Sequence, residues 1–144
     1  MTLRALRRVC RAENGATLVE FALVAPVFLV LLFGTIEFGR ALWTQQALQE
    51  TATAGARCMA LPQPACASGG AAMSYIQQVA NQWGLSLLGS NINPNPANTC
   101  GSSGISGFST VLLRYNFQSV AAAFVQIPSG GITLTAQACF PNNP

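Results

Sequence analysis

The feature that most constrains this chain is an apolar run over residues 21–36, which holds no charged residue and directly follows Glu20. The run has 16 residues, which form an α-helix about 24 Å long. Extending the helix back to Ala16 gives about 31 Å, which matches the hydrocarbon core of a bilayer. A span of that length places Glu20 inside or at the edge of the hydrocarbon, where a charge costs about 2.5–3.5 kcal/mol or more. We therefore expect this carboxylate to have a function, with snorkelling to the lipid headgroups as the alternative.

The basic charge of the chain is concentrated before this run. Four arginines and one glutamate precede Gly15, so the leader alone accounts for the net charge of +3. The remaining three arginines and three glutamates balance. Positive flanks of a membrane helix stay in the cytoplasm, which predicts a cytoplasmic N-terminus and puts everything after the helix across the membrane. A nucleic-acid-binding face needs basic residues spread over a folded surface, so we expect no nucleic-acid partner.

The sequence divides into four segments by hydropathy and helix signals. We expect a basic leader at 1–15, the transmembrane part of a helix at 16–37, a periplasmic part of the same helix at 38–60, and a small head at 61–144. Pro26 lies in the first third of the helix and is expected to kink it. The prolines of Leu61-Pro-Gln-Pro64 are expected to end the helix. A cleaved secretory signal is less favoured, because residues 35–40 are bulky and charged where such a signal needs small residues.

The head is predicted to combine a second helix with a short antiparallel sheet, which is an α+β fold. Small and apolar residues of the first helix form a stripe suited to packing on a flat sheet, at Ala41, Leu48, Ala52, Gly55 and Met59. The second helix has an apolar face made of Ala72, Ile76, Val79, Ala80 and Trp83, with Gly84 as its C-terminal cap. Residues 86–106 are rich in Asn, Pro, Gly and Ser, which predicts a loop with at most a short edge strand and a turn near 91–96.

Alternation predicts two strands near the C-terminus. The first turns Val111, Leu113, Tyr115 and Phe117 to one side and Thr110, Arg114 and Asn116 to the other. The second turns Ile132, Leu134, Ala136, Ala138 and Phe140 to the core, and its two threonines and Gln137 to solvent. Between the strands, the apolar segment 120–127 is either folded under the sheet or a contact with another subunit.

Four cysteines follow the apolar run: Cys58, Cys66, Cys100 and Cys139. If the N-terminus is cytoplasmic, these cysteines lie in a compartment that permits disulfides, whereas Cys10 in the leader stays reduced. Four cysteines allow three connectivities. We favour Cys58–Cys66 and Cys100–Cys139, because each pair brackets one structural unit; free buried thiols are the alternative. A zinc site is less favoured, since the chain has no C-x-x-C and no histidine.

The residue types that carry most acid–base chemistry are missing from the chain. It has no histidine, aspartate or lysine, and its three glutamates beyond the leader all fall on the predicted first helix. No base is therefore expected beside any serine, and no phosphate-binding glycine loop follows a strand. We expect no enzymatic activity, no catalytic residue, no metal and no cofactor.

The segment Gly15-Ala-Thr-Leu-Val-Glu20-Phe21, with Pro26 and residues 31–39 downstream, resembles the TadE-like minor pilins of the tight-adherence, or Flp-type, pilus system. The C-terminal segment 132–141 also resembles the end of this family. The first segment is similar to the processing motif of type IV prepilins, which is a glycine, four residues, then a glutamate and an aromatic residue.

The resemblance implies that a membrane aspartic prepilin peptidase cuts the chain between Gly15 and Ala16 on the cytoplasmic face. Ala16 then becomes the N-terminus, and Glu20, which precedes Phe21, is the natural partner of the new α-amine. The resemblance also implies a single-pass pseudopilin of the bacterial inner membrane, embedded in membrane lipid, with a periplasmic head. Such a subunit assembles or primes a tight-adherence pilus, with the major pilin and other minor pilins as partners.

Three questions stay open from the sequence. The subunit either enters the surface pilus or remains in the membrane. An uncleaved single-pass envelope scaffold would show the same apolar span. A pilus-tip adhesin would hold a surface ligand at loop 91–98 or at loop 120–127.

Overall fold

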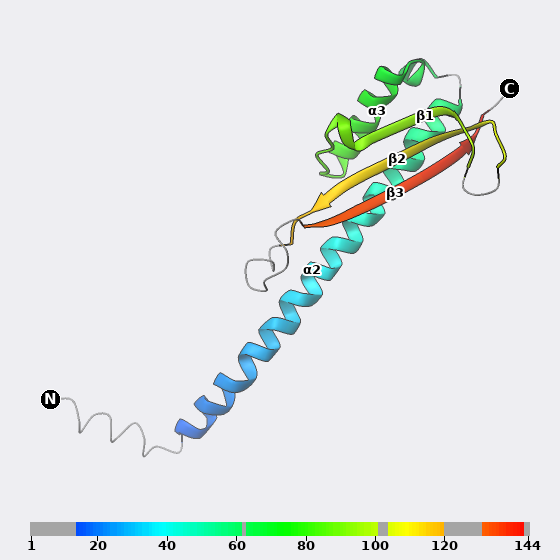
Figure 1. The fold of residues 1–144 in the computed structure, drawn as a ribbon. Helices are drawn as coiled ribbons and strands as arrows, with labels where there is room; N and C mark the ends of the chain where they lie inside the picture. The colour runs from blue at the N-terminus through cyan, green and yellow to red at the C-terminus, as the bar shows by residue number, and fades with distance from the viewer. Residues whose placement is uncertain (1–13, 62, 101–103, 120–130, 143–144) are drawn as a thin grey trace. The chain divides into compact units, whose positions relative to one another are not determined.

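The computed structural model describes residues 14–61, 63–100, 104–119 and 131–142 of the chain. Its elements follow in the order α2 (Asn14–Ala60), the 3-10 turn η1 (Pro64–Cys66), α3 (Gly69–Gln82), the 3-10 turn η2 (Gly89–Asn91), β1 (Ile92–Asn98), β2 (Phe108–Phe117) and β3 (Ile132–Pro141) (Figure 1). This combination of a long helix, a second helix and a three-stranded antiparallel sheet confirms the predicted α+β class. The leader before Asn14 and the apolar segment 120–127 lie outside the described residues.

The chain forms two compact units, residues 1–38 and residues 39–144, and the division falls inside α2. In its described part, the first unit is the apolar half of α2. The second unit contains the remainder of α2 together with α3 and the whole sheet. Residues 39–60 of α2 thus share one compact unit with residues 61–144. The helix ends at Ala60, directly before the segment of prolines that the sequence predicts as its end.

The core of the second unit lies between α2, α3 and one face of the sheet. Its buried side chains are Ala47, Leu48, Ala52 and Ala56 of α2 with Ile76, Ala80, Leu85, Leu87, Ile92, Val111, Leu113, Ala136 and Ala138. Small residues let α2 approach closely, because a Cβ added at Gly55 would lie 2.6 Å from Cγ1 of Ile76 and 3.3 Å from Cγ2 of Val111. The burial of Leu48, Ala52 and Gly55 confirms the stripe predicted for packing on a sheet.

The sheet has the strand order β1-β2-β3, and both strand pairs are antiparallel (Figure 1). Leu113 at the centre of β2 lies opposite Ile92 of β1 and Ala136 of β3, and all three side chains are buried. The core face is therefore continuous across the sheet. β1 is the edge strand that the sequence allows for within the loop at 86–106.

Three residues depart from their predicted faces. Thr110 is buried rather than outward-facing, because the side-chain amide of Asn98 on β1 donates a 3.2 Å hydrogen bond to its hydroxyl. Ile132 is 54% exposed rather than in the core, because it is the first residue of β3 and pairs with the last residue of β2 at the end of the sheet. Trp83 is 42% exposed rather than on the buried face of the second helix, because α3 ends at Gln82 and Trp83 is its C-cap.

The second helix begins and ends at residues whose chemistry favours helix ends. The hydroxyl oxygen of Ser68 accepts a 3.3 Å hydrogen bond from the amide of Ala71 in the first turn. Gly84 has a φ of +75°, a left-handed conformation that glycine adopts without strain. The amide of Leu85 then donates a 2.9 Å bond back to the carbonyl of Ala80. Gly84 thus takes the left-handed position directly after the C-cap Trp83, where the sequence predicts a glycine that ends the helix, and the turn directs the chain into residues 85–91.

The two outer strands of the sheet have different backbone features: carbonyls of β3 accept side-chain hydrogen bonds, and β1 contains prolines. On β3, the backbone carbonyls of Thr135 and Gln137 each accept a 3.0 Å hydrogen bond from the side-chain amides of Gln45 and Gln49, respectively. On the other side, β1 has the sequence INPNPAN and so contains two prolines. The glutamines that flank the buried stripe of α2 therefore fasten the helix to β3 by hydrogen bonds as well as by apolar contact.

Asn142 ties together the three strands at the far end of the sheet. Its side-chain amide donates a 2.8 Å hydrogen bond to the carbonyl of Pro96 on β1, and its Oδ1 accepts a 2.6 Å bond from the hydroxyl of Ser109 on β2. Its backbone amide donates a 2.9 Å bond to the carbonyl of Gly107. Ser109 is fully buried, so its hydrogen bond satisfies a polar group that has no access to water.

Candidate functional site

The predicted processing residues lie together at the beginning of α2. Gly15, Ala16, Glu20 and Phe21 fall in its first turns, and Glu20 is exposed. Ala16 and Glu20 are four residues apart, which places them on the same helix face. Helical side chains lean toward the N-terminus of the helix, so the Glu20 carboxylate is directed toward the turn that contains Ala16. An α-amine created at Ala16 would therefore be within reach of this carboxylate.

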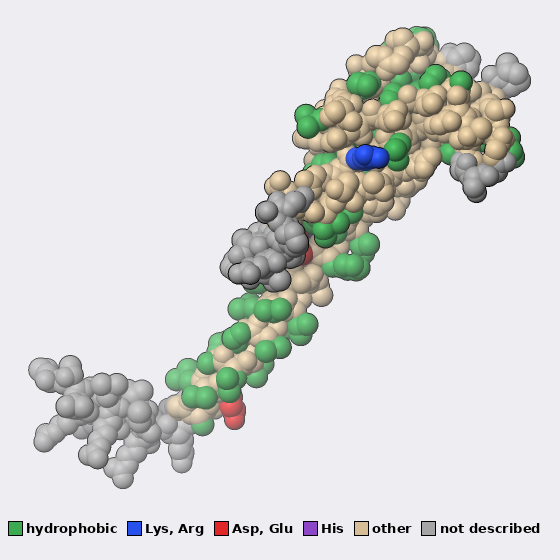
Figure 2. Space-filling model, in the orientation of Figure 1, with side chains coloured by type: hydrophobic (Ala, Val, Ile, Leu, Met, Phe, Trp, Pro, Cys, Tyr) green, Lys and Arg blue, Asp and Glu red, His purple; other side chains and the backbone are tan. Residues whose placement is uncertain are grey.

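The apolar half of α2 presents an exposed hydrocarbon surface. Its large side chains from Leu18 to Phe33 are between 42% and 71% exposed. Figure 2 shows apolar side chains along the visible face of this helical part. Among the described residues, this helix is the one long and apolar enough to cross a membrane, and its most apolar window is not buried against the rest of the chain. The surface is suited to lipid or to the helices of other subunits.

Pro26 lies inside α2, which continues on both sides of it. Proline has no backbone N–H, so the carbonyl of Ala22 lacks the donor that a helix normally provides four residues later. Membrane helices tolerate such a position when a neighbouring group supplies the missing donor. The kink expected at Pro26 stays a prediction.

The four cysteines beyond the span form two disulfides. Cys58 at the end of α2 is bonded to Cys66 of η1, with their Cα atoms 5.8 Å apart. Cys100, after β1, is bonded to Cys139 of β3, with a Cα separation of 5.9 Å. These are the two pairs that the sequence favours. One closes the turn between the helices, and the other fastens the long connection between β1 and β2 to the outer strand.

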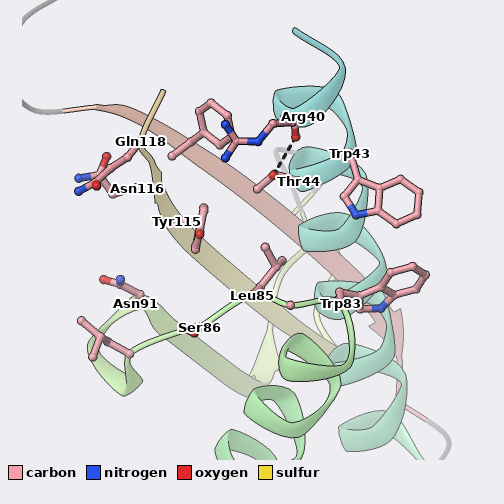
Figure 3. Close-up of a pocket in the computed structure, with 13 residues that line it drawn as sticks. Arg40, Trp43, Thr44, Trp83, Leu85, Ser86, Asn91, Tyr115, Asn116 and Gln118 are labelled. Atoms are coloured by element: carbon pink, nitrogen blue, oxygen red, sulfur yellow. Dashed lines mark hydrogen bonds between the residues drawn. The ribbon is translucent and has the colours of Figure 1, made fainter. Parts of the chain in front are cut away.

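A groove in the second unit was not anticipated from the sequence. It has a volume of about 610 Å³ and lies between α2, the 83–91 segment and the C-terminal end of β2 (Figure 3). Its lining includes one charged side chain, Arg40, whose Cζ lies 5.5 Å from the centre of the Phe117 ring. The backbone carbonyl of Arg40 accepts a 2.9 Å hydrogen bond from the Thr44 hydroxyl. The polar lining is completed by Ser86, Asn91, Tyr115, Asn116 and Gln118.

Both tryptophans of the chain line this groove. Trp43 of α2 and Trp83 at the end of α3 meet edge to face, with ring centres 5.9 Å apart and an interplanar angle of 66°. The sequence offered one signal for this pair, the rarity of tryptophan, which occurs twice in 144 residues. The signal was insufficient because the residues are 40 positions apart and only the packing of α3 on α2 brings them together.

No group of three or more His, Cys, Asp or Glu side chains among residues 14–61, 63–100, 104–119 and 131–142 is arranged to hold a metal ion. The chemistry that these residues offer is electrostatic and apolar: the Glu20 carboxylate near the beginning of α2, the Arg40 guanidinium over the Phe117 ring, and a large hydrocarbon surface.

Comparison with known proteins places a family match on the helix described above. A family model of TadE-like proteins matches residues 15–57. The match begins at Gly15 and ends one residue before Cys58, so it covers nearly the whole of α2, including Glu20 and Pro26. No curated protein and no solved structure matches the chain significantly.

Proposed function

From the TadE-like segment at residues 15–57, we propose that this protein is a processed minor pilin, or pseudopilin, that acts in assembly or priming of a tight-adherence pilus. The family connects the chain with the tight-adherence pilus system in general. One observation supports the finer assignment: the match starts at the glycine that precedes the expected cut and covers the acid five residues later. The exposed apolar surface of α2 supports insertion into the inner membrane as a single span.

The arginine-rich leader holds the N-terminus on the cytoplasmic side, where a prepilin peptidase has access to the bond between Gly15 and Ala16. Cleavage removes the leader charge and creates an α-amine at Ala16. The Glu20 carboxylate lies one helical turn away and neutralises this amine, either within one subunit or between neighbours. Opposite charges offset their desolvation only when they are well aligned, so the pair stabilises one stagger of adjacent subunits over others.

Helix packing along residues 16–36 is the proposed contact with the major pilin and with other minor pilins. The carbonyl of Ala22, which Pro26 leaves without a helical donor, gives this surface a polar point that a neighbouring helix can satisfy. The second unit is carried on the periplasmic side, where its two disulfides are stable.

The experiment that tests this proposal is intact-mass measurement of the protein purified from membranes without reductant. We expect a chain that begins at Ala16 and has lost four cysteine hydrogens to two disulfides. Gly15→Leu is the matched variant; it should keep the leader, because the peptidase accepts a small residue before the cut. A functional wild-type chain that still begins at Met1 would contradict the proposal and favour the uncleaved envelope scaffold.

A further inference from the structure

The groove of the second unit is lined by neutral polar side chains that bind nothing within the described chain. Three amides and two hydroxyls belong to this group: Asn91, Asn116, Gln118, Ser86 and Tyr115. None of these five side chains makes a hydrogen bond to another residue that the structure describes. No carboxylate is among the described lining residues, and the guanidinium of Arg40 lies over the Phe117 ring. The groove thus offers uncharged donors and acceptors that are free to bind a ligand.

The same groove has aromatic lining residues with open ring surface. Trp43 is 62% exposed and Trp83 is 42% exposed, and both belong to the lining. Their edge-to-face contact, with ring centres 5.9 Å apart, leaves much of each ring accessible to a ligand. Figure 3 shows the two indoles on one side of the lining and Asn91 and Asn116 on the other. A ligand that contacts both sides is therefore elongated and has apolar faces as well as polar edges.

Short saccharides have this combination of properties. A sugar ring has hydroxyls around its edge and C–H groups on a face, and the negative face of an aromatic ring attracts such C–H groups. A purely apolar ligand would cover the five polar side chains without giving them partners, which is unfavourable. The volume of about 610 Å³ is within the usual range of small-molecule sites and accommodates two or three sugar rings.

We propose that the groove is a binding site for a short, uncharged saccharide. The open face of Trp43 or Trp83 covers the C–H face of one sugar ring. The side-chain amides of Asn91, Asn116 and Gln118 bind hydroxyls, because an amide can donate to one hydroxyl and accept from the next. The inference uses residues of the second unit alone, so it does not depend on cleavage at Gly15 or on how the subunit assembles.

The test uses intrinsic fluorescence, because both tryptophans of the protein line the groove and their emission therefore reports on this surface. The full chain is kept in a detergent that has no sugar headgroup. It is titrated with triacetylchitotriose, a trimer of acetylated amino sugars, and separately with maltotriose, a trimer of plain glucose, each up to about 10 mM. We expect a saturable change in tryptophan emission with at least one of the two. The one that binds identifies the kind of sugar unit that the groove accepts.

Matched amide variants locate the bound sugar. Asn116→Ala and Gln118→Ala should each weaken binding about fivefold, which is the effect of losing one neutral hydrogen bond. Asn93→Ala and Gln78→Ala are the controls, because these residues are exposed amides of the same types that do not line the groove. Both controls should bind the saccharide as the wild-type chain does.

Three outcomes would overturn the proposal. If neither trisaccharide gives a saturable emission change or a heat of binding in calorimetry, the groove is no saccharide site. If the control variants weaken binding as much as the groove variants, the sugar binds elsewhere. If the anionic trisaccharide sialyllactose binds more tightly than both neutral ones, the ligand class is wrong. None of these results changes the mass expected for a chain that begins at Ala16, so failure here is distinguishable from failure of the proposed function.

Discussion

At the scale of single residues, Glu20 is the residue whose chemistry fits its surroundings least. It is a carboxylate among exposed apolar side chains, directly before Phe21 and one turn after Ala16. A charge in that setting is tolerated when a partner of opposite sign is close, and removal of one member of such a pair is costly for the other. The side chain is therefore expected to act in subunit entry rather than in stability of the second unit.

Glu20→Ala should abolish function without disturbing the fold. We expect normal cleavage and normal disulfides. The amount of pili sheared from the cell surface should fall at least roughly tenfold, because the new α-amine is left unpaired in lipid. Immunoblots of pilus and membrane fractions measure this. Glu50→Ala is the control, since Glu50 is an exposed glutamate on the second unit's part of α2. Normal pili from the Glu20 variant would contradict the assigned role.

Gly55 is the residue at which α2 depends most on the absence of a side chain. Gly55→Ala would place a methyl group 2.6 Å from Cγ1 of Ile76, which is completely buried and has little room to move. Overpacking costs about 1–3 kcal/mol, of which the higher helix propensity of alanine offsets up to about 1 kcal/mol. We therefore expect a net loss of up to about 2 kcal/mol in urea unfolding followed by tryptophan fluorescence.

Gly70→Ala provides the comparison for Gly55. Gly70 is in α3, and a Cβ there would meet nothing within 4 Å. This variant should be neutral or up to about 1 kcal/mol more stable, as expected from propensity alone. Equal stability of the two variants would mean that α2 does not pack on the sheet as closely as described.

At the scale of elements, the two disulfides differ in how much chain they close. Cys100–Cys139 spans a sequence separation of 39 residues, and Cys58–Cys66 spans 8. Loop-closure entropy gives about 4 kcal/mol of stabilisation for the longer loop and about 2.5 kcal/mol for the shorter one. Replacing each pair by alanines should therefore lower the unfolding free energy in that order. A larger loss from the Cys58–Cys66 pair would show that strain or packing, rather than closure, sets the effect.

The helices were predictable from sequence because their signals are local. The stripe at Leu48, Ala52 and Gly55, the prolines after Ala60 and the glycine after α3 each act within a few residues. Strand alternation also predicted most of β2 and β3. It was wrong at Thr110 and Ile132, because a neighbouring strand and the end of the sheet decide burial there, and neither is encoded in the strand's own alternation.

The candidate site divides in the same way. Gly15, Ala16 and Glu20 lie within six consecutive residues, so the sequence alone is enough to predict a processing site, and that site stays a prediction. The groove could not, because Arg40, Trp83 and Tyr115 come from different elements and meet only after α3 and β2 have packed against α2. Trp83 was expected in the core on helical spacing, but the helix ends one residue earlier, which turns the ring outward toward Trp43.

At the scale of the whole molecule, charge asymmetry around one span predicts orientation. Alkaline phosphatase fused after Pro144 should be active, since we expect the positive charge before Gly15 to keep the N-terminus in the cytoplasm. Replacing the leader arginines Arg4, Arg7, Arg8 and Arg11 by glutamine should lower that activity several-fold, while Arg114→Gln on β2 should not. Phosphatase activity that is independent of the leader charge would contradict the predicted topology.

The sheet has a consequence for how copies of this protein can join. Prolines in β1 lack the amide hydrogens that an added strand would need, and two carbonyls of β3 already accept bonds from glutamines of α2. Donor-strand exchange, in which one subunit lends a strand to the sheet of the next, is therefore disfavoured at both margins. We expect a polymer to grow instead by transfer of apolar helices from the lipid bilayer into a shared helix bundle. The membrane would then store the unassembled subunits.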